Sequence, residues 1–169
     1  MKLLVPWYSR TGTTGRVVRE TRAVLERLGH TVTDVAIVPR RRLPYPLWLL
    51  LSFLPGSRVP VAGGSPDPAA FDGCLLALPK WTFSCPPVNA YLAAWGARLP
   101  PTAVVVTCGG WDQDRYLRAL QRHLEGGGTL VRGGCAVRRR HVEDGSFAEP
   151  LAEFLGRVFS ALPGNDGSP

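Results

Sequence analysis

The sequence lacks three patterns that would define other classes of protein. Its four cysteines form no C-x-x-C pair and no zinc-finger spacing, so we expect neither a disulfide framework nor a metal site. The longest apolar run, Leu47 to Leu54, is far shorter than the about 20 residues that span a bilayer. Met1 and Lys2 lead directly into a short apolar run and a polar loop, which is not the pattern of a signal peptide. We therefore expect a soluble, cytoplasmic protein with free thiols.

Acidic residues are scarce relative to basic ones. Thirteen Asp and Glu stand against twenty Lys and Arg, giving a net charge of +7, which favours anionic partners such as a phosphorylated cofactor, nucleic acid or an acidic membrane surface. The basic clusters at residues 39–42 and 138–141 would suit nucleic acid. However, the expected helices carry no continuous basic face and no nucleic-acid-binding motif is present. Nucleic-acid binding is therefore the weaker alternative, and we expect no nucleic-acid partner.

The length and composition predict one folded domain. A chain of 169 residues with 45% hydrophobic residues is long enough to bury about two thirds of the surface of its unfolded form. We place this domain at residues 1–163 and a flexible tail at residues 164–169. Residues 39–71 are rich in Pro, Gly and Arg and are expected to form an irregular segment that contains one apolar helix.

Apolar, β-branched runs alternate with segments of helical periodicity along the chain. The pattern predicts strands at residues 3–7, 31–38, 73–78, 102–107 and 128–137. It predicts helices at residues 13–28, 88–99, 113–127 and 147–162, the last with a kink or a late start at Pro150. Such alternation is typical of an α/β fold. We expect a single doubly wound parallel sheet of five strands, in the order 2-1-3-4-5, between two layers of helices.

Three loops of unusual composition follow the first, third and fourth strands. They are YSRTGTTG at residues 8–15, PKWTFSCPP at 79–87 and CGGWDQD at 108–114. In the order 2-1-3-4-5 these strands are neighbours, and ligands of such sheets bind outside the carboxyl ends of the strands, where the strand order reverses. The loops combine aromatic residues, glycines, hydroxyls and one lysine, and aromatic side chains make good walls for a flat ligand. We therefore expect one crevice lined by all three loops.

The first loop has the chemistry of a phosphate cradle. The start of a helix near Thr13 provides unpaired backbone N–H groups and a partial positive charge. Neighbouring hydroxyls add donors, and Gly12 allows close approach of the backbone. The spacing matches neither G-x-x-x-x-G-K-[ST] nor G-x-G-x-x-G, which excludes the common nucleotide and dinucleotide loops. A helix capped by Ser or Thr, without any ligand, remains the alternative.

These motifs resemble those of the flavodoxin family over residues 2 to about 125. The stretch SRTGTT resembles the phosphate loop of flavodoxins, LALPKWTFSCPPVNAYL resembles their second flavin loop, and TCGGW resembles their third. The resemblance implies a flavodoxin-like sandwich with FMN as cofactor. It implies phosphate binding by Ser9, Arg10, Thr11, Gly12, Thr13 and Thr14. It implies contacts with the flavin ring from Pro79, Lys80, Trp81, Thr82, Phe83, Cys108, Gly109, Gly110 and Trp111.

Two basic residues depart from the family pattern and bear on the chemistry. Arg10 adds charge to a phosphate loop that is often uncharged, and Lys80 stands where the family commonly has an apolar residue. Electron-carrier flavodoxins are typically acidic, whereas positive charge near the flavin stabilises its anionic reduced form and raises its potential. We therefore expect a reductase that takes hydride from NAD(P)H and passes electrons to a quinone-like or protein acceptor. A flavodoxin-type carrier and a flavin-free interaction scaffold remain alternatives, and no catalytic residue is assigned.

The proline-bounded apolar run within residues 39–71 also departs from the family pattern. We consider three roles for it: a core helix that covers the sheet, a contact in a homodimer or a flap over the flavin, and a peripheral membrane contact. In the last role the adjacent arginines would face acidic lipid head groups.

Overall fold

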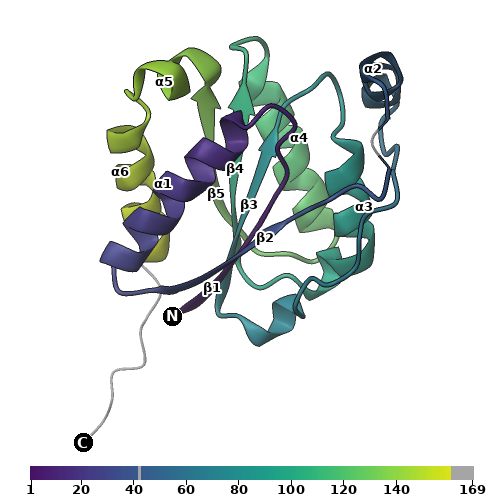
Figure 1. The fold of residues 1–169 in the computed structure, drawn as a ribbon. Helices are drawn as coiled ribbons and strands as arrows, with labels where there is room; N and C mark the ends of the chain where they lie inside the picture. Colours follow the sequence, from purple (N-terminus) through teal and green to yellow (C-terminus); the bar gives the residue numbers. More distant parts are fainter. Residues whose placement is uncertain (42, 161–169) are drawn as a thin grey trace, which may run out of the picture.

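The computed structural model describes residues 1–41 and 43–160. Five parallel strands form one sheet in the order β2-β1-β3-β4-β5 (Figure 1), as the sequence predicts. The strands are β1 (Lys2–Trp7), β2 (Thr31–Ala36), β3 (Gly73–Pro79), β4 (Thr102–Cys108) and β5 (Val131–Arg138). The expected tail at residues 164–169 lies outside the described residues.

Helices cover both faces of the sheet (Figure 1). One face carries α1 (Thr13–Arg27), α5 (Arg139–Asp144) and α6 (Ala148–Phe159), and the other carries α3 (Pro86–Trp95) and α4 (Gln113–Gly126). The helix α2 (Tyr45–Phe53) lies apart from both layers, near the edge of the sheet where the strands end. Two short 3-10 turns, η1 (Pro68–Ala70) and η2 (Gly96–Arg98), complete the elements. The chain therefore forms the expected three-layer sandwich, with one helix that belongs to neither outer layer.

The central strands are buried on both faces because helices cover each side. Along β3, Leu75 packs into the core under α1 and α6, whereas Leu76 packs into the core under α3 and α4. Both side chains are fully buried, which explains why this strand reads as a continuous apolar run rather than an alternating one. The two cores hold the sheet rigid and fix the strand ends that carry the three loops.

A glycine in the edge strand β5 allows α4 to approach the sheet closely. A Cβ atom at Gly134 would lie 2.7 Å from Cδ1 of Leu117 on α4. Such a distance is shorter than any carbon–carbon contact in a packed core. The small residue at this position therefore sets how tightly α4 packs on β5.

Several predicted boundaries are wrong. The second strand ends at residue 36 instead of 38, and the fifth spans 131–138 instead of 128–137. The helix predicted at 88–99 begins at Pro86, because proline suits a first helical turn, and ends at Trp95 before η2. The helix predicted from 147 begins at residue 148, and its predicted end at 161–162 lies outside the described residues. Pro150 lies in the first turn of α6, where it needs no kink.

The irregular segment at residues 39–71 contains the expected apolar helix, α2. Within α2 only Trp48 and Ser52 are buried, so this helix does not cover the sheet as a core helix would. No helix in the described part of the chain has the length and apolar character needed to cross a membrane.

Candidate functional site

The loop between β1 and α1 presents free backbone donors at a helix start. Gly12 precedes the first helical residue in a left-handed conformation, with φ at +88°, which glycine adopts without strain. The hydroxyl of Ser9 accepts a hydrogen bond from the Gly12 N–H at 3.0 Å. No side chain caps α1, and its first turn holds no acidic residue. The expected Ser or Thr cap of that alternative is therefore wrong, and the first-turn amides remain available to an anion.

A buried hydrogen bond ties this loop to the end of β4. The hydroxyls of Thr14 and Thr107 lie 2.7 Å apart, and both residues are almost fully buried. Thr107 also accepts a hydrogen bond from the backbone N–H of Lys80 through its carbonyl, at 2.7 Å. The first, second and third loops are thereby held to one another at the carboxyl ends of neighbouring strands, as the sequence predicts.

Arg10 lies against a cluster of aromatic rings. Its guanidinium carbon is 5.4 Å from the ring centroid of Tyr45, 5.8 Å from that of Trp48 and 5.7 Å from that of Trp81. The Trp48 and Trp81 rings meet edge to face at 5.5 Å, and Tyr8 stacks on Trp48 at 6.2 Å. Cations are attracted to the faces of aromatic rings at such distances. Arg10 is exposed, and these contacts hold its charge at the mouth of the loop.

The second loop joins α2 to the site. The Thr82 hydroxyl shares a hydrogen bond with that of Ser52, at 2.7 Å, and the Phe83 N–H donates to the Ser52 carbonyl at 3.0 Å. The ring of Phe83 itself is exposed and packs against Phe53 at 6.1 Å. These contacts anchor α2 through its buried side and hold it beside the strand ends.

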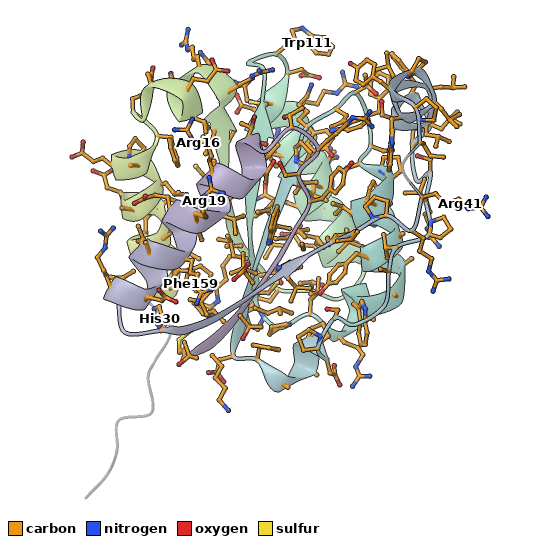
Figure 2. The ribbon with its side chains drawn as sticks, in the orientation of Figure 1. Arg16, Arg19, His30, Arg41, Trp111 and Phe159 are labelled. Carbon is orange, nitrogen blue, oxygen red and sulfur yellow. The ribbon has the colours of Figure 1, made fainter. Side chains whose placement is uncertain are left out.

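The third loop carries an exposed tryptophan. Trp111 is 72% exposed and projects from the edge of the molecule where the strands end (Figure 2). The ammonium of Lys80 lies 4.8 Å from the centre of its ring. Gly110 has φ at +108°, and this turn directs Trp111 outward.

Together these loops enclose a cavity of about 390 Å³, within the range of small-molecule sites. Its lining residues are Ser9, Arg10, Thr11, Thr13, Thr14, Tyr45, Leu49, Pro79, Lys80, Trp81, Thr82, Thr107, Cys108, Gly109 and Arg139. The described lining holds three cationic side chains and no Asp or Glu. An anionic, flat ligand matches this combination of positive charge, hydroxyls and aromatic walls.

The structure brings eleven of the fifteen predicted site residues together around this cavity. The exceptions are Gly12, Phe83, Gly110 and Trp111, which do not line it. Gly12 and Gly110 shape the loops through their backbone conformation. Phe83 and Trp111 are instead exposed, and Phe83 packs against Phe53.

Sequence reasoning missed four lining residues: Tyr45, Leu49, Thr107 and Arg139. Thr107 is a strand residue whose hydroxyl reaches the first loop, and Arg139 follows β5 at the same edge of the sheet. The position of Arg139 after a predicted strand was a usable signal, because the strands of a parallel sheet all end at this edge. Tyr45 and Leu49 carried no such signal, because they reach the site through the path of α2.

Burial controls the ionisation of the groups around the site. It raises the pKa of Tyr8 to about 12, so its phenol stays neutral at physiological pH. Burial also raises the pKa of the Cys108 thiol, against the smaller opposing effects of Lys80 and Arg138. A protonated thiol is a poor nucleophile. Within the described residues, no His lines the cavity and no group of His, Cys, Asp and Glu could hold a metal ion.

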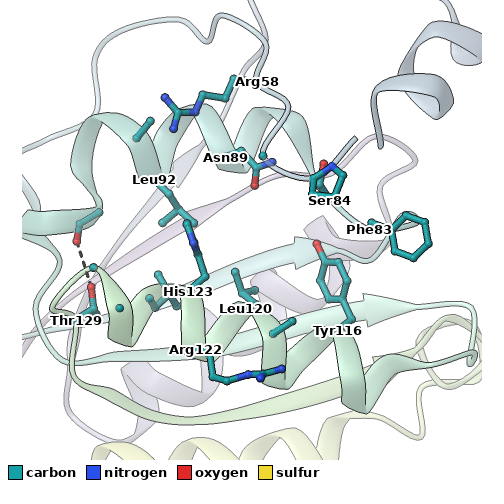
Figure 3. A pocket seen from close by; sticks show the side chains of 18 of the residues that line it. Arg58, Phe83, Ser84, Asn89, Leu92, Tyr116, Leu120, Arg122, His123 and Thr129 are labelled. Carbon is teal, nitrogen blue, oxygen red and sulfur yellow. Dashed lines mark hydrogen bonds between the residues drawn. The ribbon is translucent and has the colours of Figure 1, made fainter. Parts of the chain in front are cut away.

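A larger groove of about 770 Å³ runs between α3 and α4 (Figure 3). Leu92, Leu120 and Tyr116 line it, with Arg58, Arg122 and His123 among its polar residues. This groove has no glycine–hydroxyl loop at a helix start. The smaller cavity is therefore the better candidate for a phosphorylated ligand, in spite of its size.

The smaller cavity fits FMN, the cofactor that the resemblance implies. Uncapped amides of α1, the hydroxyls of Thr11 and Thr13, and the Arg10 cation match the donors that a phosphate group needs. Trp81 and Tyr45 supply flat apolar surface for a ring system.

No protein-family model matches the chain. An uncharacterized protein of Archaeoglobus fulgidus is 41% identical over 103 residues, which cover 61% of this chain and 67% of that protein. This match places the two sequences in one family.

Solved structures share the fold at low sequence identity. The flavodoxin of Megasphaera elsdenii is similar with a TM-score of 0.63 and 16% identity, covering 92% of this chain and 98% of the other. A flavoprotein of Lactobacillus acidophilus in complex with FMN has a TM-score of 0.60 and 17% identity, with 86% and 98% covered. An NAD(P)H:quinone oxidoreductase of Methanothermobacter marburgensis has a TM-score of 0.54 and 15% identity, with 93% and 96% covered. The chain thus has a flavodoxin-like fold and belongs to the family of the Archaeoglobus fulgidus protein.

Proposed function

We propose that this protein binds FMN and acts as an NAD(P)H-dependent reductase of quinone-like acceptors. The observation that carries the proposal is the charge of the cavity, in which Arg10, Lys80 and Arg139 line the described wall without any Asp or Glu. The flavodoxin-like fold places this cavity where sheets of this type bind their ligands. Bound FMN would supply the hydride and electron transfer, so the protein needs few reactive groups of its own.

The loop at residues 9–14 holds the phosphate in this proposal. The amides at the start of α1 donate to phosphate oxygens, and Arg10 contributes a cation from the rim. The bond between Thr14 and Thr107 fixes the first turn of the helix against β4. The amides are therefore oriented before the ligand arrives, which reduces the cost of ordering the loop on binding.

The positive side chains near the strand ends favour a negatively charged reduced cofactor. Lys80 follows β3 and Arg139 follows β5, and both line the same cavity. The charge of Arg139 is partly offset by Glu143, to which it donates at 2.8 Å, so Lys80 carries more of this effect. Positive charge stabilises the anionic reduced form more than the neutral oxidised form, and so raises the reduction potential. A carrier that works at low potential instead needs negative charge near the flavin, which disfavours the anionic reduced form.

The comparisons support the same assignment. The fold neighbour from Lactobacillus acidophilus was solved with FMN, and the neighbour from Methanothermobacter marburgensis is an NAD(P)H:quinone oxidoreductase. A flavodoxin-type electron carrier is the second candidate, favoured by the fold similarity to the Megasphaera elsdenii flavodoxin.

A redox titration of the FMN-loaded protein separates the two candidates. We expect a two-electron potential equal to or above that of free FMN, together with NAD(P)H oxidation that depends on an added quinone. A potential far below that of free FMN, without quinone-dependent turnover, would identify a carrier instead. If the protein takes up no FMN, both candidates fall and only a flavin-free interaction scaffold is left.

A further inference from the structure

Helix α2 presents a patch of exposed apolar side chains beside the cavity. The patch consists of Tyr45, Leu47, Leu50, Phe53, Leu54 and Phe83, each between 39% and 61% exposed. Leu47 and Leu50 recur at helical spacing on the outer side of α2, opposite the buried Trp48, and the exposed Leu54 follows the end of the helix. Large apolar side chains that cluster on a surface mark a site of interaction rather than random exposure.

The charged residues that flank α2 along the chain are all positive. Arg40 and Arg41 precede α2, and Arg58 follows it. The sequence has no Asp or Glu from residue 35 to residue 66. All three arginines are exposed, and the side chain of Arg41 extends away from the body of the protein (Figure 2). An apolar helix between arginines, without any carboxylate, is complementary to an apolar layer under an anionic surface.

We propose that α2 docks on the surface of an anionic lipid membrane. The apolar patch would enter the boundary between head groups and acyl chains, and the arginines would face the lipid phosphates. The tyrosine at the start of α2 suits this position, because its ring is apolar and its hydroxyl is polar. The helix would lie in the interface and would not cross the membrane.

A second copy of the chain fits this patch less well. In a two-fold dimer each patch meets its own copy, so the arginines that flank α2 would face one another as like charges. Six residues are also few compared with the about 20 to 30 residues that each partner contributes to a stable interface.

Docking through α2 would bring the cavity to the lipid. Tyr45 and Leu49 line the cavity, while Leu47 and Leu50 of the same helix face outward. Because these residues share one short helix, the mouth of the cavity lies within a few side chains of the proposed membrane surface. The acceptor would then be a quinone that resides in the lipid. This second step rests on the proposed function, whereas the docking itself does not.

Co-sedimentation with lipid vesicles tests the docking directly. We expect the protein to sediment with vesicles of phosphatidylglycerol and phosphatidylcholine at low salt, and to remain in solution with phosphatidylcholine alone. Leu50→Glu should weaken vesicle binding by about tenfold or more, because it places a charge in the apolar layer. Leu130→Glu is the matched control. Leu130 is 60% exposed, against 61% for Leu50. It precedes β5 at the amino ends of the strands, whereas α2 lies near their carboxyl ends (Figure 1).

A charge variant provides a second arm that leaves the apolar patch intact. Arg41→Glu should weaken binding to anionic vesicles by about fivefold or more, since each arginine near an anionic surface contributes about that factor. Arg19→Glu on α1, which lies on the other side of the molecule (Figure 2), should leave binding unchanged. Circular dichroism of every variant checks that it is folded.

The outcomes separate the proposal from its competitors. No sedimentation of the unaltered protein with anionic vesicles overturns the docking, whether or not the protein binds FMN. A dimer in solution that Leu50→Glu dissociates, without vesicle binding, assigns the patch to self-association. Equal losses of vesicle binding in Leu50→Glu and Leu130→Glu also overturn the docking. If vesicles bind the protein but the FMN-loaded protein, supplied with NAD(P)H, does not reduce a vesicle-embedded quinone, the docking stands and the proposed acceptor falls.

Discussion

The hydroxyl of Thr14 lies 2.7 Å from the hydroxyl of Thr107 and shares a buried hydrogen bond with it. The two residues are 93 positions apart in the sequence. Their bond joins the first turn of α1 to β4 and so fixes the helix start that faces the cavity. Since both side chains are almost fully buried, each hydroxyl depends largely on the other for its hydrogen bond.

Replacing one of these threonines should lower the free energy of unfolding by more than replacing both. Thr107→Val leaves the buried Thr14 hydroxyl without a partner, and we expect the free energy of unfolding to fall by about 1 to 3 kcal/mol. The double variant Thr14→Val, Thr107→Val removes both polar groups and should be closer to the unaltered protein. Urea denaturation measures both effects. Additive losses in the double variant would show that the bond does not couple the two elements.

Arg10 is expected to recognise the phosphate group of FMN. Arg10→Ala should weaken FMN binding by about tenfold, which corresponds to one charge-assisted contact of about 1.4 kcal/mol. Binding of riboflavin, which has no phosphate group, should change little. Titrations followed by flavin fluorescence measure both affinities. An equal loss for the two ligands would instead assign Arg10 to the aromatic cluster around the ring.

Lys80 is expected to raise the potential of the bound cofactor. Lys80→Gln removes one positive charge from the cavity wall, and we expect the two-electron potential to fall by on the order of 30 mV. Lys2→Gln is a matched control. Lys2 is the other lysine of the chain, and it lies at the start of β1, at the amino ends of the strands and away from the cavity. A redox titration reports the potential. An unchanged potential in the Lys80 variant would contradict the electrostatic part of the proposal.

Stability should fall in alkaline solution because buried groups resist ionisation. Burial raises the pKa of Cys74 and of Cys85 from 9.0 to about 12. The folded protein therefore holds these protons while the unfolded chain loses them. The stabilisation is complete below pH 9 and is lost as pH rises toward 12, by about 1.4 kcal/mol per pH unit for each proton.

Denaturation at several pH values checks this dependence. Cys85→Ala should give a shallower decline than the unaltered protein between pH 9 and pH 12, whatever its stability at pH 7. Cys135 offers a comparison, since its side chain is only partly buried. If Cys85→Ala leaves the slope unchanged, the Cys85 thiol is not protected in the folded state.

The sequence predicted the sheet order and the meeting of the three loops because both depend on local patterns. Apolar runs such as residues 73–78 gave the strands, and the rules for parallel sheets then placed their ends together. The short helix α5 (Arg139–Asp144) and the break at Gly145 that separates it from α6 were not predicted. A single glycine in an otherwise polar stretch carries little periodic signal.

The position of α2 could not be predicted from residues 39–71 alone. Its burial depends on Trp48 meeting Tyr8 and Trp81, which are distant in the sequence. Apolar residues occur on all sides of this helix, so periodicity did not indicate which side faces the protein. Consequently the contributions of Tyr45 and Leu49 to the cavity became visible only in the folded chain.

The visible absorbance spectrum of the purified protein, followed by titration with FMN, tests the central claim most directly. We expect yellow protein with the absorbance of bound flavin, or FMN-free protein that quenches the fluorescence of added FMN until a one-to-one ratio is reached. Colourless protein that leaves the fluorescence of added FMN unchanged would contradict the assignment of the cavity at residues 9–14 to this cofactor.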